Sequence, residues 1–390
     1  MLEYLRTYFI ASNGEIAYSL YAALFLVNVV ITFILTMLLM KLASKIGIVD
    51  KPSSRKVHNN SIPKLGGLAI FISLVVTFGL ASVLHPQIKS DFISSQSIAI
   101  FVGMGIMLLL GIYDDIFKAS WMWKFAFQIV AACIIVRHGI LVSKITNPFS
   151  VPIQLGAWGG MVFTIAWVVG ITNAINLSDG LDGLASGIVI IVCAVTFANS
   201  IHLMRTRPEQ YQLFVFAAVT SVCVLGAALA FLKFNFYPAK IFLGDTGSLL
   251  LGFLIACTAI RSSQLNTTTV ALVVPIIALG LPILDTVLAF LRRTSKRKNP
   301  FRADMEHIHH KIMESGLSHP ETVLVLYGFC LVLGIAALVL ALKTNQYSGV
   351  ILFVLTAITL VGFKKFGMLD ITRLWGIHDK KKKKENEPRK

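Results

Sequence analysis

Long runs of apolar residues follow one another along almost the whole chain, with short polar segments between them. A helix needs about 20 predominantly apolar residues to cross a bilayer, and these runs approach that length. The runs are continuous rather than alternating, which favours membrane-spanning helices over a β-barrel. The pattern predicts eleven spans, at residues 16–42, 66–84, 97–113, 124–142, 158–172, 184–203, 212–234, 247–261, 269–291, 321–343 and 349–363.

The fold class that follows is all-α, a polytopic helical integral membrane protein with about eleven transmembrane helices. The first run is too long for the core of a signal peptide and has no basic region just before it, so we expect a retained helix. Residues 1–365 are predicted to form one membrane domain, and residues 366–390 a disordered basic tail. Five polar loops carry the candidate chemistry, at residues 43–65, 114–124, 173–183, 235–248 and 292–320.

Composition and charge predict how the chain is oriented in the membrane. Only 14% of the residues are charged, against about a quarter in soluble proteins. Of the 35 lysines and arginines, 25 fall on the side that holds the five loops and the tail, and five fall on the other side. The positive-inside rule places the richer side in the cytoplasm, so the N-terminus is expected outside and the C-terminus inside. The lysine-rich tail suits anionic lipid, and without a recognisable module nucleic-acid binding is not expected.

Aspartates gather in the same loops as the basic residues. The segment NAINLSDGLDGLA holds Asp179 and Asp182 three residues apart, a spacing that shares one face of a helical turn. Gly180 and Gly183 would let a ligand come close. Capping of the next helix by Ser178 or Asp179 explains one acid but not both. Because ionisable residues at membrane depth are costly, this segment is a functional candidate.

Two further acidic motifs lie at the ends of apolar runs. Asp114 and Asp115 end the third run, where they either approach a metal or phosphate or remain solvated loop acids. Lys124, nine residues later, either meets a phosphate or extends its ammonium to the membrane surface. Asp245 stands in FLGDTGS just before an apolar run. A carboxylate there fits Mg²⁺, which prefers one or two carboxylates together with water and a substrate phosphate.

Histidines and a basic loop complete the set. His307, His309 and His310 could suggest zinc, but their spacing does not place all three on one helix face, and phosphate contact is the favoured interpretation. Lys64 lies in a basic loop that is either a topology signal or a clamp for an anionic ligand. The five cysteines fall in apolar runs without CxxC spacing, which is typical of small buried side chains.

In this order, the paired aspartates, NAINLSDGLDGLA, FLGDTGS and HIHH resemble the polyprenyl-phosphate N-acetylhexosamine-1-phosphate transferases over residues 45–340. The resemblance implies transfer of a sugar-1-phosphate from a UDP-sugar to a polyprenyl phosphate, with release of UMP. For a bacterial member, the expected acceptor is undecaprenyl phosphate and the expected place is the cytoplasmic membrane, with the active site on the cytoplasmic face. The expected cofactor is Mg²⁺, with Mn²⁺ as a substitute.

The resemblance also implies roles for individual residues. Asp245 matches the Mg²⁺ ligand, and Asp114 and Asp115 match a pair that assists the metal or activates the acceptor phosphate. Asp179, His309 and His310 are the other residues assigned to catalysis. The residues assigned to substrate binding are Asn176, Gly180, Leu181, Asp182, Phe242, Lys124, Arg302, His307 and Lys64.

Two differences from the family's usual motifs indicate which branch of the family the sequence resembles. Lys118 stands where the paired-aspartate motif often has a third aspartate, so no third carboxylate is assigned. His-Ile-His-His replaces the three consecutive histidines of the branch that transfers phospho-N-acetylmuramoyl-pentapeptide. We therefore expect a UDP-GlcNAc donor, as in enzymes that begin teichoic acid, O-antigen or enterobacterial common antigen synthesis. The muramoyl branch or another N-acetylhexosamine donor is the alternative.

Two other kinds of protein, a transporter and a scaffold, are alternatives to a transferase, and the oligomeric state is also open. A secondary transporter of an anionic solute usually shows internal repeats and charges near the midplane, whereas these acids gather at one face and no repeat is visible. A membrane scaffold without catalysis would leave the acids as simple loop charges. A homodimer is a further expectation for the assembly.

Overall fold

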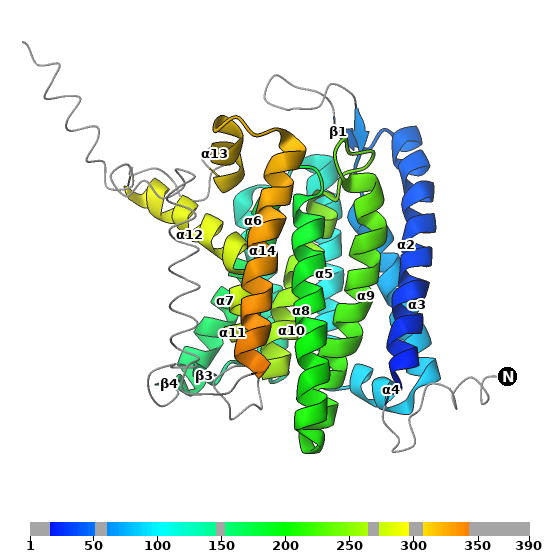
Figure 1. Cartoon of the computed structure of the whole chain (residues 1–390), viewed down its shortest axis with the longest axis vertical. Helices are drawn as coiled ribbons and strands as arrows, with labels where there is room; N and C mark the ends of the chain where they lie inside the picture. Colours follow the sequence, from blue (N-terminus) through cyan, green and yellow to red (C-terminus); the bar gives the residue numbers. More distant parts are fainter. Residues whose placement is uncertain (1–15, 51–60, 146–152, 264–272, 296–306, 343–390) are drawn as a thin grey trace, which may run out of the picture.

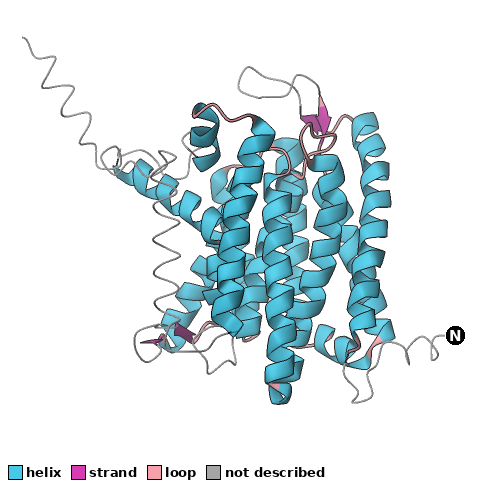
Figure 2. Ribbon diagram, in the orientation of Figure 1, coloured by secondary structure: helices cyan, strands magenta, loops and turns pink. Residues whose placement is uncertain are grey.

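The computed structural model describes residues 16–50, 61–145, 153–263, 273–295 and 307–342. Helices stand side by side along one axis and make a bundle (Figures 1 and 2). Eight helices in the described ranges are long and apolar enough to cross a membrane, which confirms a polytopic helical membrane protein. They are α2 (Tyr18–Ile46), α3 (Gly66–Leu84), α5 (Ser95–Phe117), α7 (Gly156–Ser178), α8 (Leu184–Thr206), α9 (Tyr211–Asn235) with η1 (Pro208–Gln210) before it, α10 (Gly244–Ser263) and α14 (His319–Leu342).

Shorter elements lie between these helices in the chain. The short helices are α4 (Pro86–Phe92), α6 (Trp121–Arg137), α11 (Val273–Ala278), α12 (Gly280–Ser295) and α13 (Ile308–Glu314). Two antiparallel strand pairs, β1 (Val49–Asp50) with β2 (Ile62–Pro63) and β3 (Lys144–Ile145) with β4 (Ile153–Gln154), close two of the connections.

Three of the eleven predicted spans have no counterpart among these eight helices. The fourth corresponds to α6, which has 17 residues. The ninth is not one continuous helix, because the chain turns at Leu279 between α11 and α12, and α12 then leads away from the bundle (Figure 1). Pro282 lacks the N–H that would bond the carbonyl of Ala278, which accounts for the break. The eleventh span and the basic tail lie outside the described residues, so the total number of spans remains a prediction.

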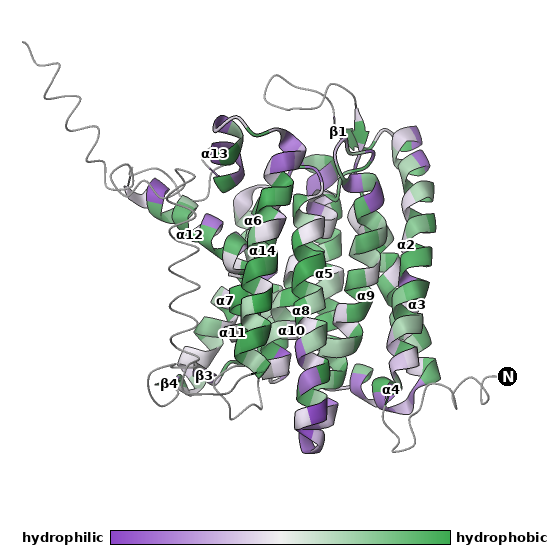
Figure 3. Cartoon of the chain, viewed as in Figure 1, coloured by the Kyte–Doolittle hydropathy of each residue, from purple (hydrophilic) through white to green (hydrophobic). Residues whose placement is uncertain are grey.

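The interior shows why these helices can associate in a membrane. Hydrophobic residues cover the middle of the bundle, and hydrophilic residues gather toward its ends (Figure 3). Inside, Thr32 of α2 donates to Ser73 of α3 at 2.6 Å, and Ser73 donates to Asn28 at 2.8 Å. Hydrogen bonds of this kind hold transmembrane helices together where apolar burial gives little driving force.

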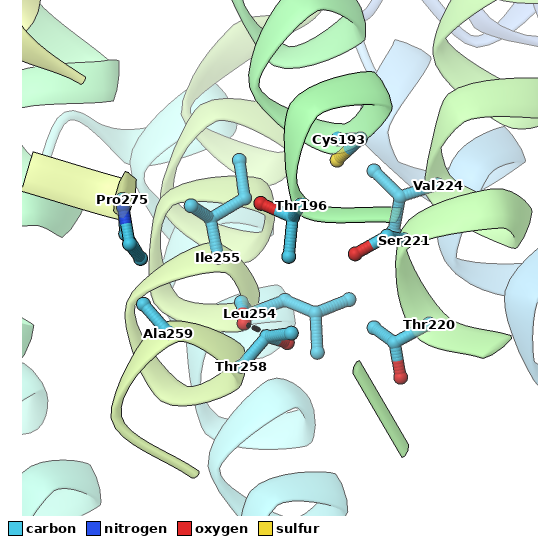
Figure 4. Close-up of a pocket in the computed structure, with 10 residues that line it drawn as sticks. All are labelled: Cys193, Thr196, Thr220, Ser221, Val224, Leu254, Ile255, Thr258, Ala259 and Pro275. Carbon is cyan, nitrogen blue, oxygen red and sulfur yellow. Dashed lines mark hydrogen bonds between the residues drawn. The ribbon is translucent and has the colours of Figure 1, made fainter. Parts of the chain in front are cut away.

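A second polar feature lies between α8, α9, α10 and α11. Thr196, Ser221 and Thr258 line a small cavity together with apolar side chains such as Leu254 (Figure 4). The Thr258 hydroxyl donates to the carbonyl of Leu254 at 2.7 Å, while the buried Thr220 hydroxyl has no partner among the described residues.

The ends of the helices sort the loops into two groups. The C-terminal ends of α5, α7 and α9, the N-terminal ends of α8, α10 and α14, the β1–β2 pair and α13 meet at one end, the upper one in Figure 1. The start of α2, α4 and the β3–β4 pair lie at the other end. All described parts of the five predicted functional loops therefore share one end of the bundle.

Candidate active site

Two carboxylates and one cation form a cluster at the end of the bundle where the five loops meet. Asp114, near the C-terminal end of α5, lies 2.8 Å through Oδ2 from the Nζ atom of Lys124 in α6. The same ammonium contacts Oδ2 of Asp245, in the first turn of α10. These three side chains remain partly exposed, so the cluster is open to a ligand.

Asp115 has a different environment from its neighbour. Its carboxylate accepts hydrogen bonds from the Thr246 hydroxyl at 2.6 Å, the Thr246 N–H at 3.0 Å and the Asp245 N–H at 3.2 Å. Its side chain is only 2% exposed, and Lys64 Nζ lies 3.6 Å from its Oδ1. An anion at the N-terminus of α10 satisfies the N–H groups there and complements the helix dipole. Adjacent helical residues point about 100° apart, which explains why the two aspartates have separate partners.

Glycines bring the start of α10 this close to α3 and α5. A side chain at Gly67 would collide with the backbone of Gly247, and one at Gly111 with the backbone of Thr246. The N–H of Gly67 donates to the carbonyl of Leu243 at 3.1 Å. Phe242, beside it, is half-buried and bonds through its backbone to Pro63 and Gly66. The position of Asp245 is therefore fixed by contacts that tolerate no β-carbon.

The NAINLSDGLDGLA segment bends between α7 and α8. α7 ends at Ser178, and α8 begins after Gly183, whose φ of 81° favours glycine. Asp179 and Asp182 thus lie in a turn rather than on one helix face. Gly183 caps α8 without a side-chain hydrogen bond, so capping by Ser178 or Asp179 is wrong.

The two aspartates of this turn have separate surroundings. Oδ2 of Asp182 accepts from the N–H of Ala239 at 2.9 Å, and its own N–H donates to Nε2 of His319 at 3.3 Å. Burial, together with the nearby charges of Asp245 and Asp115, holds the pKa of Asp179 well above its usual range. A raised pKa makes Asp179 easier to protonate than an exposed aspartate, and a protonated carboxyl can donate a hydrogen bond.

Asn176 and Leu181 flank this turn. Asn176 Nδ2 donates to the Ser248 hydroxyl at 2.8 Å, which links the end of α7 to the first turns of α10. Leu181 is buried in the hydrophobic core, so its side chain supports the turn from beneath.

The histidine motif reaches the same turn from α13. The His309 ring is buried, and a β-carbon on Gly180 would lie 3.0 Å from its Cε1 and Nε2 atoms. Burial and the neighbouring His310 lower the pKa of His309 to about 3, so this ring is neutral near pH 7. The His310 ring centroid is 4.3 Å from that of His309.

The remaining predicted site residues are placed less directly. His307 is buried, with its Nδ1 atom 3.0 Å from Oδ2 of Asp285, so its ring contacts α12. Arg302 lies outside the described residues. Among those that are described, no three histidine, cysteine, aspartate or glutamate side chains form a group able to hold a metal, so zinc gains no support there.

Three residues near the site were not assigned to it from the sequence. Asp285 gave a signal, because it is an acid inside an apolar run. His319, which contacts Asp182, and Tyr327, whose hydroxyl donates to the Gly183 carbonyl at 2.6 Å, gave none. They reach the turn from α14, more than 130 residues away in the chain.

The donor set can be compared with the needs of Mg²⁺. Asp114 and Asp245 already share one cation, the Lys124 ammonium, between their Oδ2 atoms. Mg²⁺ binds through one or two carboxylates and completes its shell with water and substrate phosphate. These two carboxylates fit that mode, whereas a site built only from protein ligands does not fit the described residues.

Comparison with known proteins identifies the family. Residues 97–263 match the model of "Glycosyl transferase family 4". A protein of Bacillus subtilis (strain 168), named "Probable undecaprenyl-phosphate N-acetylglucosaminyl 1-phosphate transferase", is 40% identical over 85% of this chain and 88% of its own length. The chain belongs to glycosyl transferase family 4.

Other relatives of the chain carry related names. A "Decaprenyl-phosphate N-acetylglucosaminephosphotransferase" of Mycobacterium tuberculosis (strain CDC 1551 / Oshkosh) is 35% identical over 76% of this chain and 77% of its own. An "Undecaprenyl-phosphate alpha-N-acetylglucosaminyl 1-phosphate transferase" of Escherichia coli (strain K12) is 30% identical over 71% and 72%. This family membership confirms the resemblance that the sequence motifs of this chain indicated.

Proposed function

We propose that this glycosyl transferase moves GlcNAc-1-phosphate from UDP-GlcNAc to undecaprenyl phosphate and releases UMP. The relatives' names support both substrates. The observation that carries the proposal is the meeting of Asp114, Asp115 and Asp245 with Lys64 and Lys124 at one end of a membrane bundle. A lipid-linked phosphate and a soluble nucleotide diphosphate both have access to such a place.

The proposed reaction is a single displacement. An oxygen of the acceptor phosphate forms a bond to the β-phosphorus of UDP-GlcNAc while the bond from that phosphorus to the bridging oxygen breaks. The electron pair of the broken bond leaves with UMP. Because the acceptor phosphate is already an anion at pH 7, positioning and charge neutralisation are the main requirements.

We assign these tasks to individual side chains from the contacts that each makes in the structure. Lys124 and Lys64 supply positive charge beside the carboxylates, where they can neutralise phosphate oxygens. Asp115 is committed to the start of α10, so we assign orientation of the acceptor phosphate to Asp114, the more exposed of the two. Asp179, whose pKa is raised by burial and by the nearby Asp245 and Asp115, is assigned to the catalytic network around the phosphates. Neutral His309 and His310 serve as hydrogen-bonding partners beside the turn.

Mg²⁺ is the proposed cofactor, held by Asp245 with support from Asp114. When bound, it would neutralise charge on the diphosphate and on the leaving UMP. We expect Mn²⁺ to substitute, since it accepts the same oxygen ligands.

The proposed setting is the bacterial cytoplasmic membrane with the site facing the cytoplasm. Basic residues concentrate in the loops at that end, which supports the orientation. The product suits the first membrane step of a cell-envelope polysaccharide, such as teichoic acid or O-antigen. A homodimer remains a prediction that light scattering of the purified protein can test.

The decisive experiment measures UMP release by the purified protein with undecaprenyl phosphate, Mg²⁺ and a panel of UDP-sugars. We expect release from UDP-GlcNAc that depends on both the acceptor and the metal. Release only from UDP-muramoyl-pentapeptide would overturn the donor assignment. Solute flux in liposomes without UMP formation would favour a transporter. Labelled phospho-enzyme formed without acceptor would replace the single displacement by a covalent route.

A further inference from the structure

Asp285 is a buried acid in α12 that the proposed reaction does not use. Its carboxylate accepts two hydrogen bonds from a different element, one from His307 Nδ1 at 3.0 Å and one from the Ile308 N–H at 2.9 Å. The side chain is 11% exposed. A buried carboxylate with two such partners is costly to disrupt, because a lost partner leaves a desolvated charge.

These two bonds complete the N-terminus of α13. Ile308 is the first residue of that helix, and its N–H is among the donors that an isolated helix leaves without a partner. His307, the N-cap residue, makes no side-chain cap bond. Asp285 therefore supplies from α12 the acceptor that a cap residue normally supplies, and its charge complements the helix dipole. A helix of seven residues needs such outside contacts to persist.

The contacts continue from α13 into the active site. The His307 and His309 rings are parallel within 2° and their centroids are 5.7 Å apart. His309 then lies against Gly180, in the turn that carries Asp179 and Asp182. These contacts connect Asp285 to the position of the His309 ring, and Asp285 and His309 also line the same small cavity.

An ionised carboxylate only accepts hydrogen bonds, so it also determines the tautomer of His307. The proton must be on Nδ1 for the bond to Asp285 to form. The ring is thereby fixed in orientation as well as in position.

We propose that Asp285 is a positioning residue of the transferase, which holds α13 and the His307 ring so that His309 stays packed against the Asp179–Asp182 turn. This inference rests on the proposed function for its kinetic consequence. Its geometric consequence is independent of any activity, since the placement of His309 can be measured directly.

The experiment compares Asp285→Leu, which removes both acceptors at similar volume, with Asp285→Asn, which retains an acceptor for the Ile308 N–H. Thr286→Val is the matched control in α12, because the Thr286 hydroxyl bonds only the Pro282 carbonyl of its own helix in the described structure. Two quantities are measured on the purified full chain. One is kcat and KM for UMP release, and the other is the rate of His309 carbethoxylation by diethylpyrocarbonate, followed by mass spectrometry.

We expect Asp285→Leu to lower kcat at least tenfold, change KM for the donor less than threefold and raise His309 modification at least fivefold. Asp285→Asn should recover most of both effects, and Thr286→Val should match the wild type. Wild-type kcat in folded Asp285→Leu, or a lower kcat without greater His309 modification, would overturn the proposal. If the wild type releases no UMP, the proposed function fails, while His309 modification still tests the geometry.

A second variant covers the case in which Asp285→Leu does not fold. His307→Phe retains the ring but loses the bond to Asp285. If Asp285 acts through this ring, folded His307→Phe should also lower kcat and raise His309 modification, as is expected of Asp285→Leu. Wild-type kcat together with wild-type His309 modification in folded His307→Phe would refute the proposal.

Discussion

Gly111 offers a sharp test of how the active site is held together. It lies in α5 one turn before Asp115, where α5 crosses the start of α10. A β-carbon built on Gly111 would stand 2.6 Å from both the Asp245 carbonyl oxygen and the Thr246 nitrogen, roughly 0.8 Å short of ordinary contact. Both neighbours are backbone atoms and cannot rotate away, so Gly111→Ala must separate α5 from α10.

The size of that shift sets the expected loss. Overpacking of this kind costs about 1–3 kcal/mol of stability. A displacement near 1 Å can reduce a rate by about 10²-fold when positioning dominates the chemistry. Because Asp115 bonds the two N–H groups that would move, we expect Gly111→Ala to lower kcat for UMP release by about 10²-fold.

Gly105→Ala is the matched control in the same helix. Nothing lies within 4 Å of a β-carbon at Gly105, so the substitution should preserve kcat. Alanine also favours a helix over glycine by about 0.5–1 kcal/mol, so the melting temperature should stay or rise. Steady-state kinetics and thermal unfolding in detergent measure both variants. Wild-type kcat and an unchanged melting temperature for Gly111→Ala would refute the close-packing argument.

Three further predictions concern charge, protonation and the turn. Lys124→Met should leave Asp114 and Asp245 without their shared cation and lower kcat at least tenfold, with Lys124→Arg less damaging; equal activity of Lys124→Met would contradict the assigned role. His309 has a pKa of about 3 when folded and about 6.5 when unfolded, so the unfolded state binds more protons between these values and stability should fall as the pH drops from 6.5. His309→Gln should show a smaller drop in melting temperature from pH 6.5 to 4.5, and an equal drop would count against the assignment. Tyr327→Phe removes the bond to the Gly183 carbonyl and should cost about 0.5–1.5 kcal/mol, measured by denaturation, with an unchanged midpoint speaking against that bond.

The helical class was predictable because membrane burial acts on each segment separately. An apolar run such as Gly66–Leu84 needs no knowledge of its neighbours to be assigned as a span. The ninth run shows where this reasoning fails, since average hydropathy does not register the hydrogen bond that Pro282 cannot make. The shared end of the five loops was predicted by counting spans, and the described parts of these loops lie at the upper end of the bundle in Figure 1.

Partners across the bundle were not predictable in the same way. Asp115 bonds Thr246, which is 131 residues away, and Asp182 bonds Ala239, which is 57 residues away. The spacing of residues within one motif contains no information about partners so far away in the sequence. The resemblance to a family supplied which residues belong to the site, but it could not tell that Asp115 is committed to the α10 backbone while Asp114 meets Lys124.

The Asp179–Gly183 turn illustrates how the structure separates two acids that the spacing suggested were equivalent. Three contacts hold the second half of this turn, from Ala239 and His319 to Asp182 and from Tyr327 to Gly183. A carboxylate whose oxygen accepts a backbone N–H is restrained in orientation, which suits recognition of a ligand by shape.

Asp179 has instead a raised pKa and lies in the field of Asp245 and Asp115, so its protonation responds to any charge that enters the site. A cationic ligand there would favour the ionised form of Asp179, and an anionic one the protonated form. We therefore expect Asp182 to act in positioning the turn and Asp179 to be the acid whose protonation changes when substrates bind.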